Sequence, residues 1–262
     1  MGVAVATGRN SGPGSYIGSA GAGFSGIGGS AVALVDADGN GRYNEFLSLP
    51  FQGSVGCDML AFDYNRNGQF DRSLDNMEDS PLSKMISAEG AYYSVTVPAD
   101  GSTIALEKID PPMASFEVIP SVTHVMLLGE AGYQTLKPSK DGKCPLAAGK
   151  YMALRYTVSK TDAKGKVWTT SAAQQYQPAA IELKPGETYR LKTGPPLAMK
   201  INTQNREPGT VEIEIAIIGQ GGETYDPRFL TCDGAGVSRT SVAFKIVNEQ
   251  GQVLQTATSE YG

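Results

Sequence analysis

Histidine and tryptophan are almost missing from this chain, which has one of each in 262 residues. The single histidine, His124, lies among apolar residues in PSVTHVMLLG. We expect it to be structural, because a catalytic triad needs a nucleophile and an acid arranged around the imidazole. No GxSxG, HExxH or GxxxxGK[ST] segment is present. We therefore predict that the protein is not an enzyme, and the sequence leaves open only an unfamiliar pair of catalytic carboxylates.

Cysteine is also scarce. Cys57, Cys144 and Cys232 are far apart, odd in number and form no CxxC pair. This spacing predicts neither a zinc site nor a disulfide framework, and it leaves room for one long-range disulfide at most.

Basic residues are outnumbered and never clustered. Lys and Arg total 22 against 27 Asp and Glu, which gives a net charge of −5. Nucleic acid is not an expected partner, because binding to phosphates needs clustered positive charge. No apolar run approaches the roughly 20 residues of a membrane helix, so no membrane span is expected. The opening MGVAVATGRN lacks the basic start and apolar core of a signal peptide, so we expect any secretion leader to lie outside this chain.

Glycine, by contrast, is abundant near the start of the chain. Residues 10–30 are dense in Gly and Ser, and we assign residues 1–30 to a flexible N-terminal segment. Gly21, Gly23 and Gly26 spell the dinucleotide motif GxGxxG. That motif must open a helix, whereas the SAVALVD that follows has the pattern of a strand. We expect a coincidence and no bound nucleotide cofactor.

The rest of the chain has the pattern of an all-β protein. Three segments, YYSVTVPADGSTIALEKI, RYTVSKTDAKGKVWTTS and VAFKIVNEQGQVLQTAT, each place Asp or Asn and Gly between two strand-like runs and predict hairpins. TVEIEIAIIG alternates Val211, Ile213, Ile215 and Ile217 with polar or small residues and predicts a half-buried strand. The best helix candidate, SPLSKMISAEG, is long enough for one or two turns.

Two proline-rich junctions, KIDPPMASF at 108–116 and KTGPPLAMK at 192–200, suggest domain boundaries. We therefore predict three modules, residues 31–110, 111–195 and 196–262. PLAAGKYMALRYTV and IELKPGETYRL in the middle module resemble the immunoglobulin-like and carboxypeptidase-regulatory-like β-sandwiches of secreted bacterial proteins. The resemblance implies tandem antiparallel β-sandwiches that act as spacers or as binding and adhesion units.

The first module contains two similar polar loops, ALVDADGNGRYNEF and AFDYNRNGQFD, whose first aspartates are 27 positions apart. Carboxylates and amides at alternate positions supply the oxygens that Ca²⁺ prefers, and a glycine at the sixth position allows the sharp turn. The loops resemble EF-hand-type calcium loops, including the dockerin-like and thrombospondin-like repeats found outside helical EF-hands. The ligands that this resemblance implies are Asp36, Asp38, Asn40, Arg42 (through its carbonyl), Asn44 and Glu45 in the first loop, and Asp63, Asn65, Asn67, Gln69 (through its carbonyl) and Asp71 in the second.

Both loops depart from the family pattern at position twelve, where Leu47 and Leu74 replace the bidentate glutamate. Glu45, or Asp75 in the second loop, is the expected substitute. With several Asn ligands, we expect weak affinity, on the order of 10⁻⁴ to 10⁻³ M. The alternative is a pair of turns in which Asp and Asn bond their own backbone without metal. The acidic residues around the second loop, Asp71, Asp75, Glu78 and Asp79, are expected to be solvated.

Together these patterns predict a non-catalytic, calcium-stabilised structural or adhesion protein that is extracellular or on a bacterial cell surface. The alternative is a carbohydrate-binding accessory module of a polysaccharide-degrading system, with Trp168 as the side chain to stack on a sugar. Self-association, or a protein or glycan partner at the cell surface, is expected in the first case. Monomer, dimer and polymer stay open.

Overall fold

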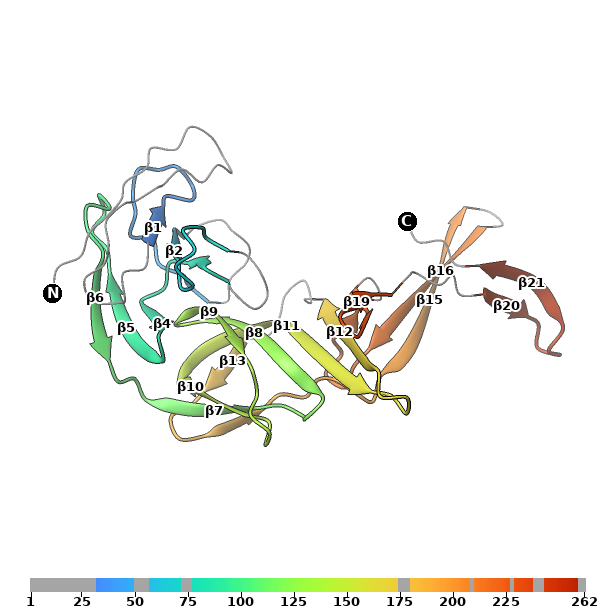
Figure 1. Cartoon of the computed structure of the whole chain (residues 1–262). Helices are drawn as coiled ribbons and strands as arrows, with labels where there is room; N and C mark the ends of the chain where they lie inside the picture. Colours follow the sequence, from blue (N-terminus) through green and yellow to red (C-terminus); the bar gives the residue numbers. More distant parts are fainter. Residues whose placement is uncertain are drawn as a thin grey trace.

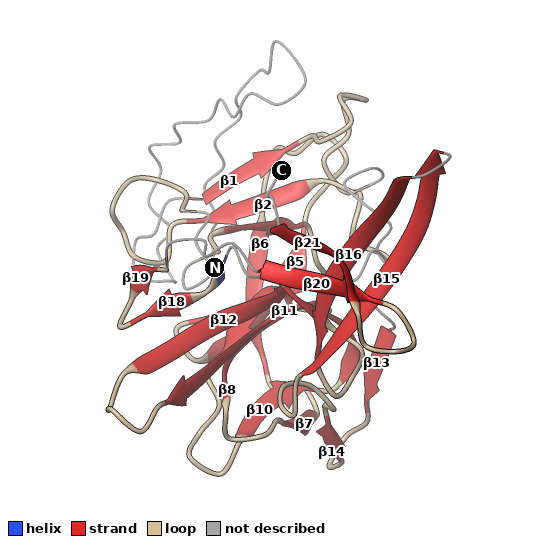
Figure 2. Cartoon of the chain, turned by 90° about the vertical axis from the view of Figure 1, so that its right-hand side faces the viewer, coloured by secondary structure: helices blue, strands red, loops and turns tan. Residues whose placement is uncertain are grey.

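The computed structural model describes residues 32–49, 57–71, 77–173, 180–207, 210–226, 229–237 and 243–258. These residues form several antiparallel β-sheets and contain no α-helix, which confirms the all-β prediction (Figure 1, Figure 2). The expected Gly/Ser-rich segment, residues 1–30, and its GxGxxG motif lie outside the described residues. Within the described ranges, no helix has the length and apolar character needed to cross a membrane.

The N-terminal unit, residues 32–109, consists of two small antiparallel sheets. The first has the order β1–β2–β3, with β1 (Val32–Val35), β2 (Met59–Phe62) and β3 (Asp79–Pro81). The second has the order β4–β5–β6, with β4 (Met85–Ala88), β5 (Ala91–Thr96) and β6 (Ala105–Ile109).

One apolar core joins these two sheets. Val32 pairs with Phe62 and Leu34 with Leu60, so the four side chains share one face of the first sheet. They pack with the buried side chains of Leu82, Ile86, Ala88, Val95, Val97 and Ile104. Full burial of a large apolar side chain is worth about 1.5–3 kcal/mol, so this core is the main source of stability in the unit.

SPLSKMISAEG, the best helix candidate, is not helical. The segment contains β3 and β4, and β4 continues through a two-residue turn into β5. Glu89 and Gly90 at that turn have φ of 50° and 75°. Two consecutive left-handed residues form the kind of turn whose twist suits a tight hairpin, and this turn chemistry outweighs the helix propensity of the flanking residues.

The central unit, residues 113–190, is a β-sandwich. One sheet has the order β10–β7–β14, with β7 (Met113–Glu117), β10 (Lys143–Ala147) and β14 (Thr188–Arg190). Its β7–β14 pair is parallel, which the antiparallel prediction did not include. The facing sheet contains β8 (Val122–Gly129), β9 (Gly132–Leu136), β11 (Gly149–Thr161), β12 (Val167–Ala173) and β13 (Ala180–Leu183). Between them lies a core that includes Phe116, Val125, Leu127, Leu146 and Tyr151, each 0–1% exposed.

The outer face of β8 and β11 is covered by the N-terminal unit, which lies directly above β8 and β9 in Figure 1. Met126, Leu128, Met152 and Leu154 on this face form an apolar cluster. Leu47, Leu49 and Met77 of the N-terminal unit and Tyr133 of β9 pack against it. Backbone N–H groups of the central unit complete the contact by bonding N-terminal hydroxyls: Tyr133 donates to Ser80 Oγ at 2.9 Å, and Ala147 to Tyr92 Oη at 3.1 Å. The two units therefore share a buried layer.

The sheet continues past the central unit into the C-terminal region. Its path runs β15–β16–β17–β12–β11–β8–β9, with β13, β18 and β19 paired at its sides. The added strands are β15 (Ala198–Glu207), β16 (Thr210–Ile218), β17 (Thr224–Tyr225), β18 (Thr231–Cys232) and β19 (Ala235–Gly236). A separate hairpin follows, formed by β20 (Ala243–Val247) and β21 (Val253–Thr258).

The β15–β16 hairpin is a long ribbon that projects from the rest of the sheet (Figure 2). Met199 pairs with Ile217 and Ile201 with Ile215, so these side chains share one face, as the alternation in TVEIEIAIIG predicts. Ile217 packs against the central core, whereas Ile215, Ile201 and Met199 are 38%, 59% and 68% exposed. The alternation is confirmed, and the expected half-burial holds at Ile213 and Ile217 but not at Ile215.

All three predicted hairpins are confirmed. β5 pairs with β6, β11 with β12 and β20 with β21, each in antiparallel register. The turn glycines Gly101, Gly165 and Gly251 have φ of 63°, 81° and 77°, the left-handed region that favours glycine.

Candidate metal site

The two polar loops have the same backbone shape. The first follows β1 and the second follows β2, and each returns toward the strand that comes next in the sheet. At the fourth and sixth loop positions, Gly39 and Gly41 have φ of 74° and 83°, and Arg66 and Gly68 have φ of 59° and 80°. Identical left-handed turns at equivalent positions show that the sequence repeat is also a structural repeat.

The first aspartate of each loop accepts hydrogen bonds from the backbone that curls around it. Asp36 accepts from the N–H groups of Gly39 at 2.7 Å and Gly41 at 2.7 Å. Asp63 accepts from Asn67 at 3.1 Å and Gly68 at 2.9 Å. Asp36 Oδ1 accepts a second bond, from the Asn40 N–H at 3.2 Å. These bonds hold both loops curled, and a further lone pair is left on Asp36 Oδ2 and on each oxygen of Asp63.

The asparagine amides lie among the remaining carboxylates. In the first loop, Asn40 Nδ2 donates to Asp38 Oδ2 at 3.0 Å and to Glu45 Oε1 and Oε2, both at 3.1 Å. In the second, Asn65 Nδ2 and Asn67 Nδ2 donate to Asp71 Oδ2 at 2.7 and 2.9 Å. In the first loop a positively polarised amide nitrogen thus lies where carboxylate oxygens converge, whereas in the second loop two amide nitrogens share one carboxylate oxygen. Hard oxygen donors gathered in this way suit Ca²⁺, so the residues present fit that ion.

The residues after the turn also match part of the calcium-loop pattern. Tyr43, at the eighth position of the first loop, packs against the core of the N-terminal unit, and its N–H donates to Ala99 O at 3.0 Å. Asn40 Oδ1 accepts from the Arg42 N–H at 2.8 Å, and Asn67 Oδ1 from the Gln69 N–H at 2.8 Å. These bonds position the backbone at the two residues whose carbonyls are expected ligands.

Leu47, at position twelve, belongs to the apolar layer under the N-terminal unit, and its N–H donates to Leu82 O at 2.7 Å. Leu74 and Asp75 lie outside the described residues. Glu45, the expected substitute in the first loop, does reach the loop interior through its contact with Asn40.

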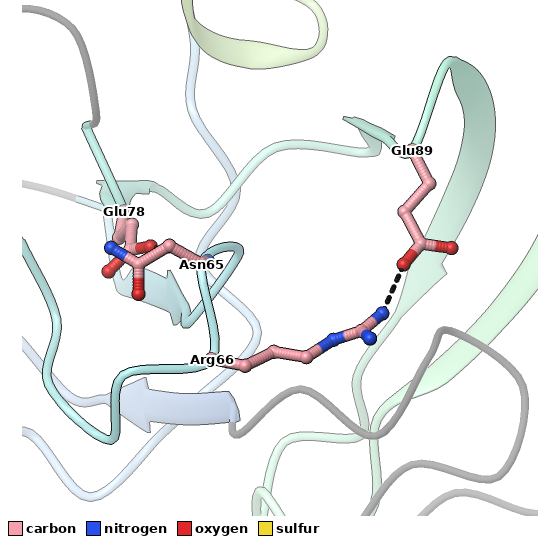
Figure 3. Close-up of polar contacts among 4 residues, drawn as sticks. All are labelled: Asn65, Arg66, Glu78 and Glu89. Atoms are coloured by element: carbon pink, nitrogen blue, oxygen red, sulfur yellow. Dashed lines mark hydrogen bonds and ion pairs between the residues drawn. The ribbon is translucent and has the colours of Figure 1, made fainter.

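A buried acidic residue outside each loop joins that loop to the first sheet. The sequence patterns did not identify either residue in this role. For the second loop this is Glu78, which is 1% exposed, so the expectation of a solvated acidic stretch was wrong there and at Asp79, which is 5% exposed. Glu78 Oε1 accepts from the Asn65 N–H at 3.1 Å, and Oε2 from the Asp71 N–H at 2.9 Å. Figure 3 shows Glu78 beside Asn65. Its carboxylate thereby joins the start of the loop to its end.

Asp58 takes the equivalent place for the first loop. It is 0% exposed, and Oδ2 accepts from the Glu45 N–H at 2.8 Å. Burial raises the pKa of this carboxyl to about 6, against partial lowering by the N–H groups of Glu45 and Ala37. The negative charges of Glu45 and Asp36 raise the pKa further. A cue was present in the sequence, because Asp58 and Glu78 each stand directly before a strand of the first sheet.

The calcium-free protein is expected to lose stability as Asp58 ionises. The folded pKa of about 6 lies above the ordinary 3.8, so the folded state binds more protons than the unfolded chain between these values. The free energy of unfolding should therefore fall by up to about 3 kcal/mol as pH rises through that window. Urea unfolding in chelator at several pH values measures the change, with Asp58→Asn as the control. If both proteins have the same pH dependence, the burial of an ionising Asp58 is refuted.

Arg66 links the second loop to a neighbouring turn. Its Nη2 lies 2.5 Å from Glu89 Oε1, at the turn between β4 and β5 (Figure 3). Both side chains are about half exposed, at 50% and 51%, so the ion pair adds little stability. Both residues have a left-handed backbone, with φ of 59° at Arg66 and 50° at Glu89.

The other residues singled out from the sequence lie away from the loops. His124 is half-buried in β8, with Nδ1 3.2 Å from Thr123 Oγ1. Trp168 is half-buried in β12 and donates from Nε1 to Asp162 Oδ2 at 3.0 Å. The three cysteines are free thiols, so the possible long-range disulfide is not formed in this structure.

Across the described residues, no three His, Cys, Asp or Glu side chains form a ready metal-binding group. Both loops alternate acids with asparagine, so their oxygen donors are mixed carboxylates and amides. Comparison with known proteins finds no matching family model, no similar curated protein and no similar solved structure.

Proposed function

We propose that the chain is a non-catalytic, calcium-stabilised structural or adhesion protein of the extracellular space or cell surface, with immunoglobulin-like sandwich architecture. The observation that carries the proposal is the repeated loop, in which the asparagine at the fifth position, Asn40 or Asn67, donates from its amide to a carboxylate of its own loop. In the first loop, Asn40 Nδ2 lies within 3.1 Å of three carboxylate oxygens. A divalent cation would neutralise this negative charge more completely than an amide does.

Asp36, Asp38, Glu45 and the Arg42 carbonyl would hold Ca²⁺ in the first loop. Asp63, Asp71 and the Gln69 carbonyl, with amide oxygens, would do so in the second. When bound, Ca²⁺ supplies a positive charge that ties the start of each loop to its end, a purely structural contribution. The amide oxygens of Asn40, Asn65 and Asn67 accept the N–H groups of Arg42, Asn67 and Gln69, so these oxygens would reach the ion only after giving up those bonds.

The arrangement of the units supports a mechanical role. A buried apolar layer joins the N-terminal unit to β8 and β11, and one hydrogen-bonded sheet continues from there to the β15–β16 ribbon. Ca²⁺ bound in the two loops would stiffen the N-terminal unit, which covers β8 and β11 of that sheet. Rigid connections of this kind suit a spacer or an adhesive module at a cell surface.

Calcium is expected to raise the melting temperature of chelator-treated protein, because a ligand that binds only the folded state stabilises it by mass action. At millimolar Ca²⁺ the expected gain in unfolding free energy is about 1–3 kcal/mol, given the weak affinity expected of such loops. Calorimetric titration gives the stoichiometry and affinity, and thermal melting with and without calcium gives the gain.

The gain should disappear in the double variant Asp36→Ala, Asp63→Ala. Because both aspartates also bond the loop backbone, the variant should melt lower even in chelator, so the measured quantity is the difference made by calcium. Asp100→Ala is the matched control, since Asp100 accepts from the Ser102 N–H at 3.1 Å in an ordinary turn outside the loops. A wild-type protein that gains nothing from calcium would rule out the proposal.

A further inference from the structure

The apolar face of the β15–β16 ribbon continues the inner face of the central sandwich. Ala172 of β12 and Tyr225 of β17 are both buried in the central core and lie directly opposite each other. Tyr225 is in turn opposite Ile217, and Ile217 is opposite Met199. Because directly opposite residues of an antiparallel pair point to the same side of the sheet, Met199 lies on the face that carries the core.

The smaller sheet of the sandwich does not extend over the ribbon. That sheet, β10–β7–β14, is 3-stranded, and β14 is its last strand before the chain enters β15. In Figure 2 the ribbon runs away from β7, β10 and β14. Ile217 at the base of the ribbon packs against the core, whereas Ile215, Ile201 and Met199 are 38%, 59% and 68% exposed. The large sheet therefore extends past the smaller one as an overhang with an apolar inner face.

The opposite face of the ribbon is polar. The charged and amide side chains alternate with the apolar ones and point the other way, and they are Lys200, Asn202 and Gln204 on β15 and Glu212 and Glu214 on β16. On that face Asn202 Nδ2 donates to Glu214 Oε2 at 3.5 Å. An antiparallel sheet with one apolar and one polar face packs its apolar face on another layer, and two strands without such a layer are only marginally stable in water. The ribbon thus has the surface that one half of a β-sandwich presents to the other half.

We infer that this apolar face is covered by the same face of a second copy of the chain, related by a two-fold axis. The covering layer has to be apolar inside, polar outside and about as long as the ribbon, and a second ribbon meets all three conditions. When the two apolar faces meet, Lys200, Glu212 and Glu214 of both copies point outward, so no like charges are brought together. The contact is also closed, because each overhang covers the other.

The expected dimer is weak. β16 is 9 residues long, so the ribbon is about 30 Å long and, with two strands, about 10 Å wide. Two such faces bury roughly 600–1,000 Å² in total, which is at the low end for a specific interface, so association should depend on concentration. It should not depend on calcium, because the ribbon is at the other end of the large sheet from the strands that the N-terminal unit covers (Figure 1).

Sedimentation velocity over about 1 µM to about 1 mM protein tests the inference, since this range covers the affinities of weak interfaces. The mean mass of the wild type should rise with concentration from 27.6 kDa toward twice that value, in calcium and in chelator alike. Ile201→Lys places a charge on the apolar face of each copy and should weaken association at least about tenfold. Asn202→Lys is the matched control: it adds the same charge at the next position, on the polar face, and should associate as the wild type does.

Melting at the lowest protein concentration shows whether Ile201→Lys is folded. A melting temperature close to that of the wild type is expected, because the side chain is 59% exposed in a single copy. If the variant does not fold, Met199→Lys, at a position that is 68% exposed, takes its place with the same expected loss of association.

A wild type whose mass stays at 27.6 kDa throughout overturns the inference, assigns the face to a partner of another kind and leaves the calcium proposal untouched. An equal loss of association in Ile201→Lys and Asn202→Lys also overturns it, because the contact would then run along the edge of β15 and not across the apolar face. Unchanged association in Ile201→Lys overturns it as well, since the dimer would then use a different surface.

Discussion

Replacing Glu223 with alanine is expected to destabilise the protein by about 5 kcal/mol, well above the loss that most single substitutions cause. Glu223 is 4% exposed and accepts four hydrogen bonds at the junction between the central unit and the C-terminal ribbon. The donors are Thr193 Oγ1 at 2.7 Å, Tyr225 Oη at 3.0 Å, the Gly221 N–H at 2.9 Å and the Gly194 N–H.

The size of the effect follows from what the substitution leaves behind. Each buried donor without an acceptor costs about 1–3 kcal/mol, and water has little access to this site. The turn is also shaped for the carboxylate: a Cβ at Gly219 would lie 1.9 Å from Glu223 Oε1, and one at Gly221 would lie 2.1 Å from Lys192 O. Nothing else in the turn can move in to replace the lost oxygens.

Urea unfolding measures the loss, and hydrogen exchange locates it. Exchange at the amides of Gly194 and Gly221 should become much faster in Glu223→Ala, because both amides lose their acceptor. Glu223→Gln is the matched control: it keeps the shape and one oxygen, and should cost less than half as much. An alanine variant within about 1 kcal/mol of wild type would show that the junction does not depend on this carboxylate.

Gly129→Ala is expected to destabilise the central unit by about 4 kcal/mol, above the usual 1–3 kcal/mol of an overpacked core. Gly129 ends β8 directly opposite Tyr151 of β11. A Cβ at this position would lie 2.1 Å from Tyr151 Cδ1 and 2.8 Å from Lys150 O. The Tyr151 ring fills the space that a side chain at position 129 would need.

The ring has no room to move aside. Tyr151 is 0% exposed, and its hydroxyl donates to Ala147 O at 2.8 Å, so both ends of the side chain are held. The clash must therefore distort the β8–β11 pairing, which carries the core on one face and the N-terminal unit on the other.

Urea unfolding of two glycine variants provides the test. Gly236→Ala makes the same chemical change in β19, where a Cβ would meet no atom within 4 Å and φ is not left-handed, and it should be nearly neutral. Tyr151→Phe removes only the hydroxyl and should cost about 1 kcal/mol. Equal stability of Gly129→Ala and Gly236→Ala would contradict the close packing of the ring on the glycine.

Local structure was predictable wherever neighbouring residues decide it. The three hairpins depend on Asp, Asn and Gly at turn positions, and each has a left-handed glycine where the sequence places one. The two loops share backbone turns because they share residue types at the same spacing. SPLSKMISAEG, the best helix candidate, forms strands for a related reason: Glu89 and Gly90 make a tight hairpin turn.

The burial of β8 and β11 on both faces also left a trace in the sequence. VMLL at 125–128 and YMAL at 151–154 are apolar without alternation, as expected of strands covered on two sides. The pattern indicates that both faces are covered, but not what covers them. That the N-terminal unit supplies Leu47, Leu49 and Met77 for this purpose is visible only in the structure.

The sequence by itself determined the all-β class, the hairpin turns and the two repeated polar loops, because these depend on residues a few positions apart. Only the tertiary structure decided that Asp58 and Glu78 are buried beneath the loops, that β14 pairs in parallel with β7, and that Glu223 joins the central unit to the ribbon. The physical reason is distance along the chain: hydrogen bonds and burial between remote segments depend on how the whole chain packs, which no local pattern of residues specifies.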